Sequence, residues 1–216
     1  MLQVVNHPLI QHKLGLMRDI KTPTKEFREL CGEIASLLCF EATKDLSLEE
    51  KTVKIWTGEE IKVRQLAGKK LVLVPIWRAG TYLSAGVEKL IPTAKVNPIG
   101  VYRDETTQEP RPYYENWCSD LSQRTIFIMD PMLATGGTID YTISRLRAQG
   151  CHDIRVVCLV ASIKGKETLE KKYPAVPIFA AALDPILDKN GYIRPGLGDA
   201  GDRLFGPKDL NTPPQS

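Results

Sequence analysis

Five short apolar runs set the fold class of this chain. Each run is rich in β-branched residues and nearly unbroken, rather than alternating between apolar and polar positions. Such runs are typical of parallel strands that are buried on both faces of a sheet. They cover residues 70–77, 97–103, 125–131, 154–162 and 177–184.

Helical patterns lie before and between these runs. Residues 138–150 repeat apolar residues at helical spacing and end on a glycine, residues 165–173 form a short amphipathic crossover, and a longer helix is expected over residues 24–40. Strands that alternate with helices predict βαβ units. We therefore expect an α/β fold with a mainly parallel central sheet flanked by helices, and the length of 216 residues fits one domain.

Two other segments have patterns of their own. Residues 51–63 alternate around Gly58, which predicts a β-hairpin within an arm over residues 48–66. Residues 104–120 are polar and contain several prolines, and they are too long for an ordinary connection. Loops of that length are usually functional or disordered, so we expect a flexible loop here.

Composition excludes several classes of protein. The 29 basic and 26 acidic residues are intermixed, which argues against a nucleic-acid binder with a basic stripe. No apolar run approaches the roughly 18 residues of a membrane span, and the first residues lack the order of a signal peptide. The five cysteines form no C-x-x-C pair and the three histidines are few for a metal site. These features predict a cytoplasmic protein with reduced thiols.

The stretch "IFIMDPMLATGGT" at residues 126–138 carries the strongest chemical signal. An apolar strand ends at Asp130, and a loop rich in glycine and threonine leads into a helix. Ligands of parallel α/β sheets bind outside the carboxyl ends of the strands. The first N–H groups of the helix, with the Thr135 and Thr138 hydroxyls, would bind a phosphate, and Asp130 would accept hydrogen bonds from a sugar diol. The alternative is an ordinary capped turn with an incidental acid.

Two other phosphate motifs fail. The chain contains no G-x-x-x-x-G-K-[ST] sequence, which argues against a P-loop enzyme. The stretch "GLGDAG" at 196–201 matches G-x-G-x-x-G, but only 15 residues follow it. They leave no room for the helix, strand and acid of a dinucleotide-binding fold.

Over essentially its whole length the sequence resembles uracil phosphoribosyltransferases. Three blocks carry the resemblance: "VPIWRAG" at 74–80, "DPMLATGG" at 130–137 and "GYIRPGLGDAGDRLFG" at 191–206. The wider phosphoribosyltransferase clan usually has two adjacent acids before its glycine loop. Here Pro131 takes the second position, as in the uracil branch.

The resemblance implies a type I phosphoribosyltransferase fold with the β-hairpin arm and a C-terminal base-binding hood over residues 185–206. It implies a pyrimidine salvage reaction in which uracil and 5-phospho-α-D-ribose 1-diphosphate (PRPP) give UMP and diphosphate. Mg²⁺ is the implied cofactor, held mainly by the substrate and possibly by Asp199, which could instead cap a turn. The loop 104–120 would close over the reaction as a flap.

The resemblance also implies two sets of site residues. PRPP would be bound by Arg78 and Arg103 at its pyrophosphate, by the loop residues Asp130, Pro131, Met132, Leu133, Ala134, Thr135, Gly136, Gly137 and Thr138, and by Asp199. Uracil would be bound by Tyr192, Ile193, Gly198, Asp199 and Ala200, chiefly through backbone groups.

Members of the family form dimers or larger homo-oligomers, often through the arm, and some respond to GTP, so both are expectations here. The sequence departs from the family at Trp77 and Tyr82, where smaller residues are usual, and at 180–183, where more polar residues are usual. Two other hypotheses remain open. One is a catalytically silent nucleotide sensor or RNA-binding regulator on the same fold, and the other is a transferase for a different base.

Overall fold

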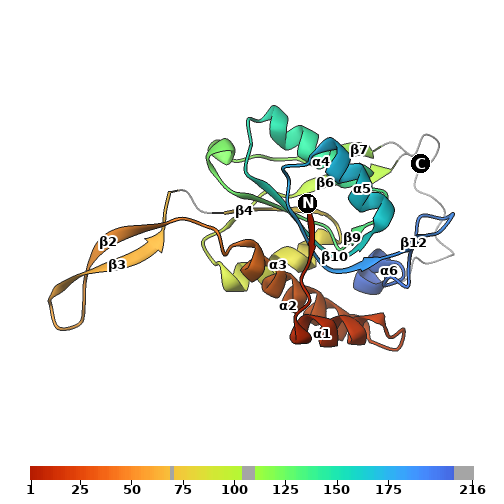
Figure 1. Cartoon of the computed structure of the whole chain (residues 1–216), viewed down its shortest axis with the longest axis horizontal. Coiled ribbons are helices and arrows are strands. Elements are labelled where there is room, and N and C mark those ends of the chain that lie inside the picture. Colours follow the sequence, from red (N-terminus) through yellow and green to blue (C-terminus); the bar gives the residue numbers. More distant parts are fainter. Residues whose placement is uncertain (69–70, 104–109, 207–216) are drawn as a thin grey trace.

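A mainly parallel sheet forms the centre of the molecule (Figure 1). The computed structural model describes residues 1–68, 71–103 and 110–206. Across the sheet the strands follow the order β1 (Leu2–Val4), β11 (Ile178–Asp184), β10 (Ile154–Ser162), β8 (Ile126–Met129), β4 (Val72–Trp77), β6 (Ile99–Arg103) and β7 (Pro110–Glu115). Neighbours along this path are parallel except β6 and β7, which are antiparallel. All five apolar runs form strands, so the predicted fold class is confirmed.

Helices cover both faces of the sheet, as Figure 1 shows. One face packs against α1 (Pro8–Arg18), α2 (Thr24–Ala42) and α3 (Gly80–Leu90), and the other against α4 (Gly137–Ala148) and α5 (Ile163–Lys172). Successive strand residues point to opposite faces, so alternate positions of β4, β8 and β10 enter the two hydrophobic clusters. This burial on both faces explains why the runs are continuous rather than alternating.

The predicted helices are present with slightly different bounds, and α1, α3 and the short α6 (Ala200–Phe205) are additional. Glycine permits two close approaches of α3. A Cβ on Gly80 would lie 2.2 Å from the Met129 carbonyl oxygen, and one on Gly86 would lie 2.1 Å from the Gly32 carbonyl oxygen of α2. The start of α3 can therefore pass directly over the end of β8, and its middle can pack backbone to backbone against α2.

The predicted hairpin consists of β2 (Leu48–Lys54) and β3 (Glu60–Leu66), an antiparallel pair that extends away from the sheet (Figure 1). Gly58 has φ +91° in the connecting turn, a conformation that glycine adopts without strain. Trp56, in the same turn, is 95% exposed. The hairpin is thus confirmed, and it extends a few residues beyond the predicted 51–63.

The prediction of one continuous loop over 104–120 was wrong for its second half. Residues 104–109 lie outside the described residues, but Pro110–Glu115 forms β7, followed after a short connection by a 3-10 helix at Leu121–Gln123. Tyrosines favour strands, and prolines are tolerated at the edge of a sheet, which is where β7 lies. The ring of Tyr113 also packs over Gly100 of β6, where a Cβ would lie 2.5 Å from it.

The remaining elements are short. β5 (Lys95–Val96) pairs with β4, β9 (Met132–Leu133) pairs with β10, and β12 (Ile186–Leu187) pairs with β13 (Ile193–Arg194), before the final α6 (Ala200–Phe205). In the portion of the chain that the structure describes, no helix combines the length and apolar character needed to cross a membrane.

The packing of the five free cysteines predicts their reactivity. Burial raises the pKa of the Cys39 thiol to about 12 and that of Cys151 to about 11, and it also raises those of Cys31 and Cys158. Because the thiolate is the reactive species, we expect Cys118, the half-buried thiol, to be alkylated first at about pH 8. Mass spectrometry of peptides after brief iodoacetamide treatment would measure this, with guanidinium-unfolded protein as the fully labelled control. Early labelling of Cys31 or Cys158 would contradict the packing.

The contact between α2 and α3 predicts a large effect of one methyl group. Gly86→Ala places a Cβ against the Gly32 backbone, so we expect it to lower the free energy of unfolding by about 1–3 kcal/mol or more. Gly15→Ala is the matched control, because a Cβ there meets nothing within 4 Å and alanine favours the helix. Urea titration of both variants would test this. Equal stability of the two would show that the helices can separate without cost.

Candidate active site

The candidate site lies at the carboxyl edge of the parallel strands. Arg78 follows β4, Asp130 follows β8, and Ser162 ends β10. Because these strands are adjacent and parallel, their ends meet at one edge of the sheet. This is the edge at which α/β proteins bind ligands.

The loop from Asp130 to Thr138 connects β8 to α4, as predicted. An Asp130 carboxylate oxygen accepts a hydrogen bond from the Met132 N–H at 3.4 Å, which turns the chain away from the strand. Gly136 precedes α4 in a left-handed conformation with φ +87°. A glycine at this point lets the loop reverse into the helix and leaves the first helical N–H groups for a ligand. The Gly137 N–H lies 3.4 Å from the Thr135 hydroxyl oxygen.

Contacts from the end of β10 hold this loop in place. The Ser162 hydroxyl donates to the Ala134 carbonyl oxygen at 2.5 Å and accepts from the Gly165 N–H at 2.9 Å. A Cβ on Gly165 would lie 2.6 Å from the same Ala134 oxygen. The sequence did not lead us to expect this support of the loop. Its signal was the serine between an apolar strand and a helix, the usual place of an N-cap.

The hood is tied to the body by an ion pair between the half-buried Arg18 and the buried Asp184. Asp184, 5% exposed at the end of β11, receives two hydrogen bonds from the Arg18 guanidinium, each at 2.8 Å. Asp184 also accepts from the Gly196 N–H, and Arg18 donates to the Gly196 carbonyl oxygen, both at 2.8 Å. Gly196 has φ +57°, and a Cβ there would lie 2.0 Å from the Ile193 carbonyl oxygen. The turn that follows β13 is therefore held by α1 and β11 together.

Asp199 has two partners. One carboxylate oxygen caps α6 by accepting from the Asp202 N–H at 3.0 Å, as the alternative interpretation proposed. The other lies 3.4 Å from the Tyr192 hydroxyl, which donates to it. The negative charge of Asp199 raises the pKa of Tyr192, so this hydroxyl keeps its proton near neutral pH.

A cavity of about 240 Å³ joins the two predicted sets of residues. On one side it is lined by Asp130, Pro131, Met132 and Ala134 of the loop, and on the other by Tyr192, Ile193, Gly198, Asp199 and Ala200 of the hood. A smaller cavity of about 30 Å³ continues from Asp130 along the loop to Leu133, Gly136 and Thr138. Segments more than 50 positions apart in the sequence thus face one space.

The two arginines are placed differently. Arg78 is exposed on the turn between β4 and α3, and its neighbour Ala79 lines the larger cavity. The Arg78 guanidinium lies 5.0 Å from the centroid of the Phe205 ring. Arg103 is the last residue of β6, and its side chain, like residues 104–109, lies outside the described residues.

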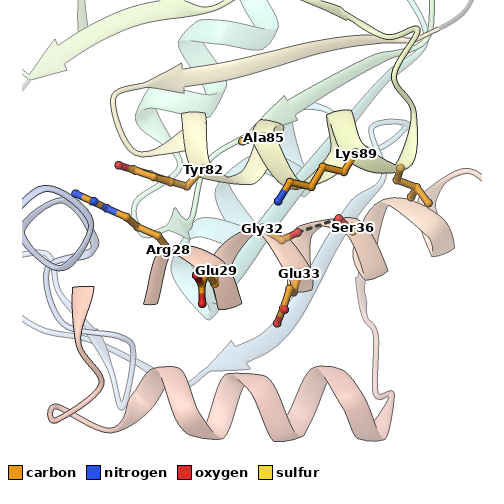
Figure 2. Close-up of a pocket in the computed structure, with 10 residues that line it drawn as sticks. Arg28, Glu29, Gly32, Glu33, Ser36, Tyr82, Ala85 and Lys89 are labelled. Carbon is orange, nitrogen blue, oxygen red and sulfur yellow. Dashed lines mark hydrogen bonds between the residues drawn. The ribbon is translucent and has the colours of Figure 1, made fainter. Parts of the chain in front are cut away.

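A larger hollow exists elsewhere. The α2–α3 groove, of about 510 Å³, lies between α2 and α3 and is lined by Arg28, Gly32, Ser36, Tyr82, Gly86 and Lys89 among others (Figure 2). None of the predicted site residues lines it. Its size does not make it the reaction site, because it lacks the strand-end acid and the glycine loop.

The carboxylates suit the implied metal. Over residues 1–68, 71–103 and 110–206, no three His, Cys, Asp or Glu side chains form a group that could hold a metal ion alone. Asp130 and Asp199 nevertheless line the same cavity. One or two carboxylates with substrate oxygens and water are the usual ligands of Mg²⁺, so the residues fit an ion held mainly by substrate.

Known proteins share the sequence family and the fold of this chain. The family described as uracil phosphoribosyltransferase matches residues 4–207. Among solved structures, the AQ2163 protein from Aquifex aeolicus is 37% identical, with a TM-score of 0.90 over 95% of this chain and 98% of that one.

More distant structures share the fold alone. A hypoxanthine-guanine phosphoribosyltransferase from Bacillus anthracis is 11% identical, with a TM-score of 0.51 over 73% of this chain and 79% of that one. A hypoxanthine phosphoribosyltransferase from Staphylococcus aureus is 18% identical, with a TM-score of 0.50 over 79% and 85%. The family match spans nearly the whole chain. The chain belongs to the uracil phosphoribosyltransferase family.

Proposed function

We propose that this phosphoribosyltransferase uses uracil as its acceptor and forms UMP and diphosphate from uracil and PRPP. Family membership supports transfer of a phosphoribosyl group. The observation that carries the finer proposal is the single cavity between the loop at Asp130 and the hood at Gly198–Ala200. A sugar phosphate bound by the first and a base bound by the second would meet there.

The loop suits a ribose 5-phosphate. The 5-phosphate would bind the N–H groups at the start of α4, where the helix dipole favours an anion, with Thr135 and Thr138 as additional donors. Asp130 would accept hydrogen bonds from the ribose hydroxyls. These contacts fix the sugar with its anomeric carbon toward the hood.

The hood suits a small flat base. Uracil presents alternating carbonyl and N–H groups along its edge, and backbone groups at Ile193 and Gly198–Ala200 can pair with such a pattern. Small residues in this turn allow the backbone to approach a ring closely. Tyr192, with its pKa raised by Asp199, would stay neutral as it shields the base.

Transfer of the phosphoribosyl group requires mainly charge stabilisation and positioning of the reactants. The bond from the ribose anomeric carbon to the pyrophosphate oxygen breaks, the bond to uracil N1 forms, and the N1 proton leaves. An oxocarbenium-like sugar and a highly charged leaving group develop together. Arg78 and Arg103 would bind the pyrophosphate, and Mg²⁺, when bound with Asp199 or Asp130 nearby, would neutralise part of its charge.

Three wider expectations belong to the same proposal. The exposed β2–β3 arm favours a homodimer or larger assembly, because an isolated hairpin is marginally stable. The five free thiols favour a cytoplasmic location. GTP is kept as a candidate effector on the family resemblance alone.

The loop acid provides the first test of the site. We expect Asp130→Asn to lower UMP formation by about 10²-fold or more, because it removes the charge beside the developing cation. Asp153→Asn is the matched control, since Asp153 precedes β10 at the opposite edge of the sheet and is 50% exposed at its side chain. Initial rates with labelled uracil would measure both. Equal loss in the two variants would point to general instability instead of a site role.

The choice of base provides the second test. Purified protein with PRPP and Mg²⁺ should convert uracil to UMP and leave cytosine, hypoxanthine and orotate unchanged. Nucleotide formed from another base would overturn the assignment of uracil as the acceptor, but it would still support phosphoribosyl transfer. Tight binding of UMP with no product from any base would instead support the regulator hypothesis.

A further inference from the structure

Four side chains from separate elements form a row of contacts, which we call the stack, with an arginine at each end and two aromatic rings between them. The Arg28 guanidinium of α2 lies 5.1 Å from the ring centroid of Tyr82 in α3. The Tyr82 ring lies 5.4 Å from the Phe205 ring at the end of α6, with the two planes at 55°. The Arg78 guanidinium lies 5.0 Å from the centroid of the Phe205 ring. The stack thus runs from the α2–α3 groove to the turn after β4.

The far end of the stack is fixed. Figure 2 shows the Arg28 and Tyr82 side chains extending in the same direction at one end of the α2–α3 groove. The Arg28 Nε donates a hydrogen bond to the Leu204 carbonyl oxygen at 2.6 Å, one residue before Phe205. Arg28 therefore contacts Tyr82 with its charge and α6 with a hydrogen bond, and so links the two helices that carry the aromatic rings.

Arg78 lies at the near end of the stack, next to Phe205. It is exposed, and long side chains lose considerable rotamer freedom when they are ordered. Within the described part of the chain no carboxylate forms an ion pair with it, and its guanidinium lies over the Phe205 ring. A carboxylate would neutralise the charge and compete with an anion. An aromatic ring attracts the cation through its face and leaves the in-plane N–H groups available.

We propose that Phe205 and Tyr82 are positioning residues that hold Arg78 in place for the pyrophosphate group, with Arg28 closing the stack. The inference rests on the proposed function in taking pyrophosphate as the anion that Arg78 binds. It also gives a role to Tyr82, which stands where the family usually has a small residue. A small residue at position 82 would leave Phe205 without its neighbouring ring.

The test compares leucine variants, which remove a ring, with variants that keep one. Phe205→Leu and Tyr82→Leu should weaken binding of Mg²⁺–pyrophosphate and raise KM for PRPP by about 3- to 10-fold, the range expected for loss of a cation–π contact. Phe205→Tyr and Tyr82→Phe should bind like the wild type. KM for uracil should stay constant in all four, whereas a general disturbance of α6 would raise it. Calorimetry and initial rates supply these values.

A double-mutant cycle shows whether Phe205 acts through Arg78. In an Arg78→Ala background, Phe205→Leu should cause no further loss of pyrophosphate binding, because the side chain that it positions is gone. A loss as large as in the wild-type background would overturn the inference. So would wild-type pyrophosphate affinity in the leucine variants, or a wild-type protein that does not bind pyrophosphate.

These outcomes separate the inference from the assignment of uracil. An active enzyme whose leucine variants bind pyrophosphate normally would overturn the positioning role and leave the proposed function intact. A coupled cycle in a protein that prefers another base would support the positioning role and overturn the uracil acceptor. The ring-current shift of the Arg78 side-chain NMR signals, lost in Phe205→Leu, reports the contact without any turnover.

Discussion

Burial of β4, β8 and β10 on both faces is the constraint from which the candidate site follows. Every residue of β8 and β10 is buried, so these strands offer no place for a charged ligand along their length. Parallel strands satisfy their backbone groups within the sheet, and apart from Arg155 near the start of β10 the side chains of these two strands are apolar until β10 ends at Ser162. The first acid after β8 is Asp130, and the first hydroxyl at the end of β10 is Ser162. Both consequently come to the same edge, where one faces the cavity and the other supports the loop.

The elements contained in one short stretch of sequence could be predicted, whereas contacts between distant parts of the chain could not. The strand runs and the loop at 130–138 were predictable, because period, glycine content and the strand-end acid are contained in a short window. The support of Ala134 by Ser162 and the clamp between Arg18 and Asp184 were not, since each joins positions far apart in sequence. The error over Pro110–Glu115 had a related cause. Proline and charge in this stretch suggested a loop, but pairing with β6 made it an edge strand.

The ion pair between Arg18 and Asp184 holds the shape of the hood. A turn built from small residues can approach a base closely, but it has few side chains of its own with which to hold its shape. Asp184 and Arg18 supply this rigidity by binding both the N–H and the carbonyl of Gly196. A buried carboxylate left without its partner would cost about 3–5 kcal/mol, so the pair strongly favours one position of the turn. In this arrangement the N-terminal α1 contributes to a site that the sequence places at the other end of the chain.

Two of the departures from the family pattern, Trp77 and Tyr82, have a common physical meaning. Trp77 stacks on Tyr114 of β7, with ring centroids 4.7 Å apart and planes at 22°, and Tyr82 packs on Phe205 of α6. One contact precedes Arg78 in the chain and the other follows it, and each joins the turn after β4 to a different neighbouring element. Aromatic pairs of this kind contribute about 0.5–1.5 kcal/mol beyond their buried area. The large side chains of Trp77 and Tyr82 therefore hold the turn that carries Arg78 from both ends. Neither places a negative charge near the Arg78 guanidinium.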